Sequence, residues 1–202
     1  VETEREVVAN ERRYRVDDDV TGMMSELMHK TAYRVHPYRW PTIGWMEHIQ
    51  SFTVEDCQAF YKTHYAPNNV TLVVVGDFDE RRTIAKIEEL YGGLEKQALP
   101  KPPELVEPPQ NEERLEVIQW PMSAARLSIG YPVVSLGHPD HAALTAMNEV
   151  LFGGRSGRLR ARLVDEEELT SEIYGWMPPL RWPGLYDVNA ALREGVEWKR
   201  VV

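Results

Sequence analysis

The sequence lacks a second cysteine, because Cys57 is the only one among its 202 residues. An internal disulfide and a cysteine-based zinc ribbon both need at least two thiols, so both are excluded. Long apolar runs are missing too. The apolar stretch 71–75 ends at Gly76 and Asp77, far short of the roughly 20 residues that cross a bilayer. We therefore expect no membrane span.

A basic tract is also missing. The chain has 32 acidic against 23 basic residues and a formal charge of −9, which repels a phosphate backbone, and its arginines are spread along the chain. We therefore expect no nucleic-acid partner. The lone cysteine does not decide the compartment, so a periplasmic and a cytoplasmic location in a bacterium both stay open. The first residues carry no basic and apolar leader pattern, so we expect any targeting signal of the parent protein to lie outside this sequence.

The first part of the chain predicts helices and one strand. Helix formers dominate residues 2–15. Thr53, followed three residues later by Asp56, predicts a capping box at the start of a helix that would bury Phe60. Residues 71–78, with the sequence TLVVVGDF, are rich in β-branched side chains and predict a buried strand.

A proline-rich connection, residues 95–113, follows this part. Its five prolines favour an extended segment, so we place the domain boundary here. Residues 1–94 would form a first lobe. Residues 114–202 would form a second lobe, which we expect to be truncated.

The second lobe predicts mainly strands. Four segments have strand-like composition, namely 114–120, 125–131, 171–177 and 185–192. A helix should carry Leu144 and Leu151, and Ser156 should cap a short helix after it. The predicted fold class is α+β: a largely antiparallel sheet with helices packed on one face, arranged as two lobes.

Two carboxylates lie on one face of the first predicted helix. Glu4 and Glu11 are seven residues apart, with Val7 and Val8 between them. Spacing alone favours two solvated members of a charge-rich helix, since glutamates are rarely buried unpaired.

The six histidines and the serines supply no recognisable active site. His138 and His141 are three residues apart, and capping or surface roles are more typical of such a pair than metal binding. Ser156 lies in the sequence GRSGR, which lacks the G-x-S-x-G pattern of a nucleophile elbow. A serine hydrolase stays open only as a third interpretation.

Four motifs resemble landmarks of the pitrilysin/insulinase family of zinc metallopeptidases, the inverzincins, and occur in the family's order. They are EREVVANERRYRVDDD at 4–19, HPY at 36–38, FTVEDCQAFYKTHYAPNNVTLVVVGDF at 52–78 and GGRSGRL at 153–159. The resemblance spans residues 4 to about 175. It implies that the parent is a zinc-dependent metalloendopeptidase that hydrolyses peptide or unfolded polypeptide substrates, with Zn2+ as its cofactor.

The resemblance also implies roles for the two glutamates. Glu11 would be the third protein ligand of the zinc ion, and Glu4 would be a catalytic-site carboxylate that orients or tunes the site. Residues 1–94 would then contain the end of the metal-site helix region. The family's His-x-x-Glu-His motif is absent from this sequence, so we expect this chain alone to be inactive.

The family's halves differ in one further motif. The half without the metal motif usually carries an arginine and, seven residues later, a tyrosine that hold the substrate, and Val164 and Ser171 stand at these positions. Together with Glu11, this places the chain in the metal-binding half. A second homologous half or subunit would complete a clamshell. The alternative is a non-catalytic structural or peptide-binding homologue of the same family.

Overall fold

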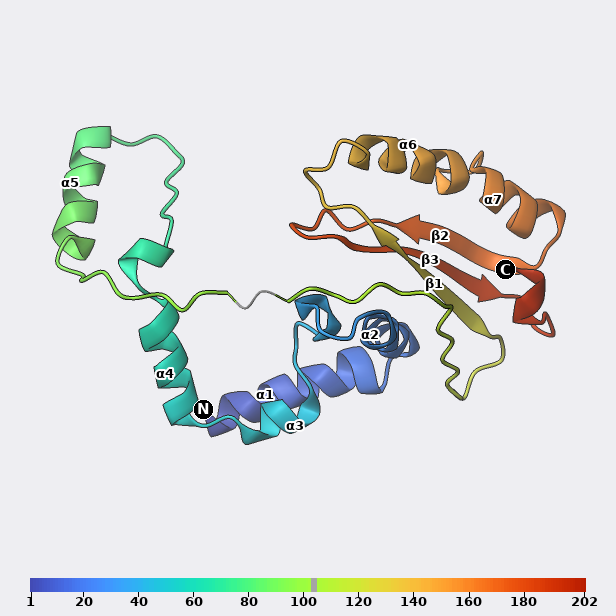
Figure 1. Ribbon diagram of the computed structural model, residues 1–202, viewed down its shortest axis with the longest axis horizontal. Coiled ribbons are helices and arrows are strands. Elements are labelled where there is room, and N and C mark those ends of the chain that lie inside the picture. Colours follow the sequence, from blue (N-terminus) through green and yellow to red (C-terminus); the bar gives the residue numbers. More distant parts are fainter. Residues whose placement is uncertain (103–104) are drawn as a thin grey trace. The chain divides into compact units, whose positions relative to one another are not determined.

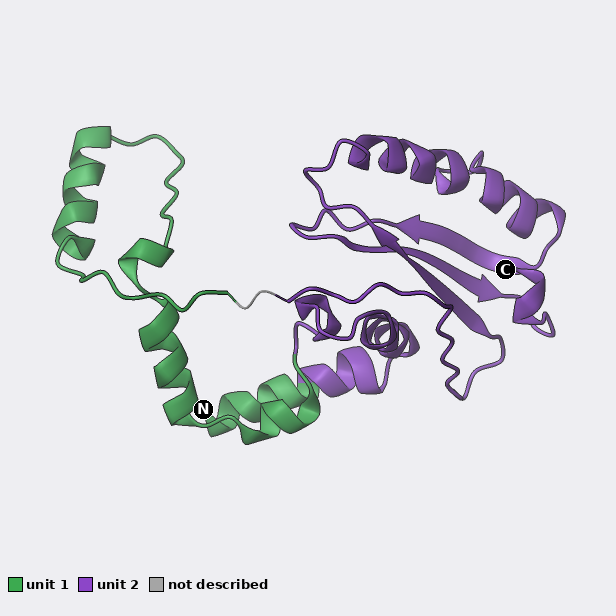
Figure 2. Ribbon diagram, viewed as in Figure 1, with its two compact units in different colours: residues 1–10, 44–104 green, residues 11–43, 105–202 purple. Residues whose placement is uncertain are grey.

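The computed structural model describes residues 1–102 and 105–202. Pro103 and Glu104, which belong to the predicted proline-rich connection, lie outside the described residues. The chain divides into two compact units, each made of two separate stretches (Figure 2): Val1–Asn10 with Gly44–Glu104, and Glu11–Ile43 with Leu105–Val202. The boundary between the units falls within the first helix. The division into lobes at residues 95–113 stays a prediction.

The first unit is helical. Its elements are most of α1 (Glu2–Arg12), α3 (Met46–Ser51), α4 (Val54–His64), the short 3-10 helix η3 (Pro67–Asn69) and α5 (Glu80–Tyr91). The predicted capping box at the start of α4 is confirmed. The Thr53 hydroxyl accepts a hydrogen bond from the Asp56 amide at 3.1 Å, and the Asp56 carboxylate accepts one from the Thr53 amide at 2.9 Å.

Two predictions for this unit are wrong. Residues 71–78 form no strand, and the side chains of Val73 and Val75 are 75% and 90% exposed. Phe60, expected inside, is 59% exposed. A strand needs a hydrogen-bonded neighbour, and the three strands found among the described residues pair only with one another, in the second unit. The apolar sequence is therefore present without the sheet that would bury it.

The second unit contains an antiparallel sheet of three strands in the order β1-β3-β2. The strands are β1 (Arg126–Val133), β2 (Thr170–Trp176) and β3 (Gly184–Leu192), which confirms three of the four predicted strand segments. The fourth segment, 114–120, is not paired as a strand. The predicted α+β class with an antiparallel sheet is confirmed.

Helices lie against both faces of this sheet (Figure 1). The helices α6 (His141–Phe152) and α7 (Arg158–Arg160) cover one face, α7 continues into the π-helical turn η4 (Ala161–Glu166), and α2 (Val20–Ala32) lies over the opposite face. The remaining short elements are the π-helical turn η1 (Arg13–Asp17), which continues α1, and the 3-10 turns η2 (Pro37–Arg39) and η5 (Trp198–Arg200).

The main apolar core lies between the sheet and α6, α7 and η4. It includes Phe152, Leu163, Ile173, Tyr186 and Leu192. The prediction that Ser156 caps a helix is wrong. Gly157 is the N-cap residue of α7 and no side chain caps it, because the chain turns one residue later than the sequence pattern suggested. Within the described ranges, no helix is long and apolar enough to span a membrane.

Candidate functional site

The first helix has a buried side and an exposed side. Ala9 and Arg12 are buried, whereas Glu4, Val7 and Glu11 are exposed. This separation follows from the helical period of 3.6 residues, which returns positions 4, 7 and 11 to one side. The structure therefore places the two predicted site carboxylates on the same solvent-facing stripe of α1.

The surroundings of the two carboxylates differ. Glu11 forms a surface ion pair one turn along the helix, with 3.0 Å between its Oε1 atom and Nε of Arg15, and its side chain is 46% exposed. Such an exposed pair contributes only about 0–1 kcal/mol, so the Glu11 carboxylate can leave Arg15 at little cost when another cation binds it more tightly. The Glu4 side chain makes no hydrogen bond or ion pair with any described residue.

A buried ion pair fixes the rotation of the end of α1. Arg12, only 6% exposed, donates two hydrogen bonds to the Glu26 carboxylate on α2, at 2.7 and 2.9 Å. Gly22 allows this close approach, since a Cβ atom there would lie 1.9 Å from the Arg15 carbonyl oxygen. Because Arg12 points inward toward α2, its neighbour Glu11 is held on the outward side.

Glu11 alone does not make a metal site. The carboxylate oxygen suits Zn2+ as one ligand, but a catalytic zinc ion needs about three protein ligands and a water molecule. Among the residues that the structure describes, no group of three or more His, Cys, Asp or Glu side chains could hold a metal ion. The donor set is therefore incomplete within this chain, and Glu11 could contribute a single ligand.

The paired histidines take structural positions. Nδ1 of His138 accepts a hydrogen bond from the Asp140 amide at 3.2 Å, just before α6. His141 is the first residue of α6. Neither takes part in a potential metal cluster in the described parts of the chain.

The two positions that carry the substrate-holding pair in the family have different chemistry here. Val164 is 8% exposed and belongs to the apolar core. Ser171 is an exposed residue on β2, and its hydroxyl donates a hydrogen bond to the Ala191 carbonyl oxygen at 3.3 Å. Neither position offers a guanidinium or a phenol to a peptide.

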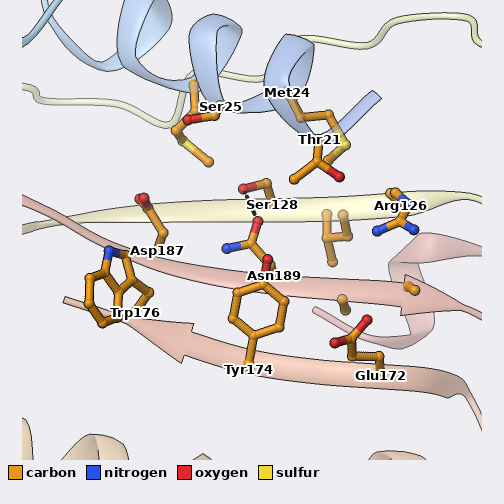
Figure 3. Close-up of a pocket in the computed structure, with 14 residues that line it drawn as sticks. Thr21, Met24, Ser25, Arg126, Ser128, Glu172, Tyr174, Trp176, Asp187 and Asn189 are labelled. Atoms are coloured by element: carbon orange, nitrogen blue, oxygen red, sulfur yellow. Dashed lines mark hydrogen bonds between the residues drawn. The ribbon is translucent and has the colours of Figure 1, made fainter. Parts of the chain in front are cut away.

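Sequence reasoning missed a cavity of about 180 Å³ between α2 and the sheet (Figure 3). Its lining includes polar and aromatic side chains from all three strands, namely Arg126, Ser128, Glu172, Tyr174, Trp176, Asp187 and Asn189. The signal in the sequence was the alternation along β2, where Glu172, Tyr174 and Trp176 are separated by Ile173 and Gly175. This period of two predicts one apolar and one polar face.

The helices and the three-stranded antiparallel sheet have the fold of part of a peptidase M16 protein, as the comparisons show. The family profile described as "Peptidase M16 inactive domain" matches residues 51–197. The chain therefore belongs to the peptidase M16 family, the pitrilysin/insulinase family that its motifs resemble. Glu4 and Glu11 precede the matched residues, so their roles and the assignment to the metal-binding half stay predictions.

Individual relatives support this membership. The chain is 35% identical, over 181 residues, to the protein named zinc protease PqqE of Helicobacter pylori, an alignment that covers 85% of this chain and 39% of that protein. A protease crystal structure from Helicobacter pylori superposes with a TM-score of 0.86 at 30% identity, covering 98% of this chain and 50% of that one. A peptidase M16 inactive domain from Pseudomonas fluorescens gives 0.72 at 25% identity, covering 95% and 46%. The chain thus spans half or less of the length of these relatives.

Proposed function

We propose that this chain is part of a zinc-dependent metalloendopeptidase that hydrolyses peptide bonds in peptides or unfolded polypeptides. The observation that carries the proposal is the outward stripe of α1, where Glu11 is exposed and held only by a surface ion pair. The name of the Helicobacter pylori relative, a zinc protease, supports the same activity.

In this proposal the residues of the chain have separate tasks. Glu11 supplies one carboxylate ligand to zinc, after giving up its contact with Arg15. Glu4, on the same stripe, orients or tunes the site through its negative charge. The buried pair of Arg12 and Glu26 keeps the stripe turned outward. The zinc ion, when bound, polarises the scissile carbonyl and lowers the pKa of a bound water molecule.

The remaining parts of the active site come from outside these 202 residues. Two histidine ligands and a glutamate base would be supplied by a His-x-x-Glu-His segment on another part of the parent protein. A second homologous half or subunit would close the clamshell around the substrate. The chain by itself would then have no peptidase activity.

The test compares the full-length parent protein with its Glu11→Gln and Glu6→Gln variants. Glu6 is an exposed carboxylate on the same helix that the prediction leaves outside the site, so it controls for the loss of one negative charge. We expect about one zinc ion per site in the parent and the Glu6 variant, and loss of zinc and of peptide cleavage in the Glu11 variant. Zinc content and activity that survive Glu11→Gln would contradict the proposal.

A second candidate function is a non-catalytic structural or peptide-binding subunit. One observation favours it: the matched profile describes an inactive domain. A full-length parent that binds no zinc and cleaves no peptide, yet assembles with a homologous partner, would establish this function in place of the first.

A further inference from the structure

The cavity between α2 and the sheet carries one feature that the proposed function does not use. Strand β3 directs Asp187 into the cavity from below, and α2 covers it from above (Figure 3). The Oδ1 atom of Asp187 is buried, and it has no hydrogen-bond partner among the described residues. A buried carboxylate oxygen without a partner is costly, so the site favours a donor that the chain does not itself provide.

The neighbouring polar groups do not supply that donor. The Ser128 hydroxyl is already committed, because it donates to the Asn189 side-chain oxygen at 2.7 Å. The Tyr33 hydroxyl is buried and likewise has no partner in the parts of the chain described. Burial, followed by the negative charge of Asp187, raises the Tyr33 pKa to about 12. Burial also raises the pKa of Asp187 above its ordinary value, and the nearby His29 opposes this only in part.

The rest of the lining suits a cation with an apolar stem. Trp176 and Tyr174 on β2 line the cavity and are 57% and 40% exposed. Aromatic faces attract cations, and the thioethers of Met24 and Met28 on α2 add polarisable apolar contact. Its volume of about 180 Å³ equals that of roughly six water molecules at about 30 Å³ each, which accommodates four methylenes and an ammonium group.

The two ends of the cavity differ in charge. Asp187 and Trp176 are at one end, whereas Arg126 and Glu172 are at the other (Figure 3). Arg126 and Glu172 carry opposite charges, whereas Asp187 is the one carboxyl group that the lining has at its own end. This arrangement selects a positive group at the Asp187 end and disfavours an anion there.

We propose that this cavity binds a primary ammonium group, held by the Asp187 carboxylate and the aromatic ring of Trp176 at one end, with the Tyr174 ring further along the lining. The group can belong to a lysine side chain or to the amino terminus of a chain. One ammonium group offers three N–H donors, and its hydrogen bond to the Asp187 carboxylate would be strengthened by the opposite charges.

The test measures binding of small amines to the full-length parent protein by titration calorimetry and by amide chemical shifts. N-acetyl-lysine amide presents only the side-chain ammonium, glycinamide presents only an amino-terminal ammonium, and N-acetyl-norleucine amide keeps the four-carbon side chain without the ammonium group. We expect the lysine or the glycine compound to bind with shifts at β2 and β3, and the norleucine compound not to bind. Equal affinity for the lysine and norleucine compounds, or no binding of either amine up to roughly 10 mM, would overturn the proposal.

Variants locate the site. Asp187→Asn keeps the shape of the side chain and should weaken amine binding about tenfold or more, while Glu172→Gln at the opposite end should change it less than about twofold. If Asp187→Asn does not fold, Trp176→Leu replaces it, since that exposed ring can be removed without opening the core. Unchanged affinity in the Asp187 or Trp176 variant would contradict the assignment. The measurement needs neither zinc nor catalysis, so its outcome is independent of the proposed peptidase activity.

Discussion

At the scale of single residues, two arginines three positions apart show how burial decides the value of an ion pair. Arg12 is buried and paired with Glu26, which is also largely shielded, whereas Arg15 pairs with Glu11 at the surface. Removing one partner of a buried pair leaves the other charge uncompensated in a poorly solvated place. A surface pair loses little, because water and salt screen both charges.

We therefore predict that Arg12→Ala lowers the free energy of unfolding by about 3–5 kcal/mol, and Arg15→Ala by less than about 1 kcal/mol. Urea unfolding followed by far-ultraviolet circular dichroism measures both values. Similar losses for the two variants would show that the Arg12 pair does not hold α2 to the end of α1. In the full-length parent, Arg12→Ala should also cause loss of zinc, because the Arg12–Glu26 pair would no longer fix the rotation of α1 that keeps Glu11 on the exposed side.

Glu107, in the proline-rich segment, should make the stability of the fold depend on pH. Its carboxylate accepts hydrogen bonds from three consecutive amides after α2: Arg34 at 2.7 Å, and Val35 and His36 at 2.9 Å each. Burial by itself raises the pKa of Glu107, but the three amide bonds and the charge of Arg114 outweigh it and hold the pKa below its ordinary value of 4.5.

A folded-state pKa below the unfolded one means that the unfolded chain binds the proton more tightly. The Glu107 contribution is therefore fully present above pH 4.5 and is lost as the pH falls through the lower folded-state value. We predict that Glu107→Gln costs about 1–2 kcal/mol at neutral pH, discounted for partial exposure, and that the difference from the wild type shrinks below pH 4. Glu113→Gln, at an exposed position nearby, is the control. A difference that persists unchanged at pH 3 would refute the role of the charge.

At the scale of elements, the start of α4 depends on the reciprocal bonds between Thr53 and Asp56. Thr53→Ala removes the acceptor for the Asp56 amide, and we predict a loss of about 1 kcal/mol in the stability of α4. Hydrogen exchange of the first-turn amides of α4 should rise roughly fivefold. Thr63→Ala, which removes only a hydroxyl bonded within the helix to the Ala59 carbonyl oxygen, should leave these amides unchanged. Equal effects of both variants would argue against the capping box.

The elements that could be predicted from the sequence are those with local signals. The helix of residues 2–15 and the capping box at Thr53 each depend on neighbours within a few residues, so their patterns were sufficient. The strand at 185–192 was predicted from its composition, and it has partners in β1 and β2. The strand predicted at 71–78 failed because a strand is stabilised by a partner far away in the sequence, and no described strand pairs with it. The same limit applies to 114–120.

The candidate site could be predicted only in part, for a similar reason. Helical spacing placed Glu4 and Glu11 on one face correctly, but a zinc site requires ligands from several elements, and spacing within one helix does not reveal them. The cavity at Asp187 depends on α2 and the sheet, which lie far apart in the sequence. Only the alternation along β2 pointed to it.

At the scale of the whole molecule, apolar surface is distributed unevenly. The second unit buries nine core residues between its sheet and helices, whereas the first unit leaves the run 71–75 exposed. A β-prone run of this kind, low in charge and without proline, is a typical template for pairing with another chain. The isolated chain should therefore associate through this segment rather than through its sheet.

We predict that the 202-residue chain forms concentration-dependent oligomers at micromolar levels, and that Val73→Lys suppresses them. Val73 is 75% exposed at the centre of the run, so a lysine there adds charge to the pairing edge without disturbing a packed core. Val106→Lys is the matched control, because Val106 is 84% exposed and lies in an extended segment outside the run. Sedimentation velocity over a range of concentrations measures the species present. A wild-type chain that stays monomeric would contradict the prediction of association. Equal suppression by Val73→Lys and Val106→Lys would show that net charge or another surface controls association, since only pairing through residues 71–75 makes the position of the added lysine decisive.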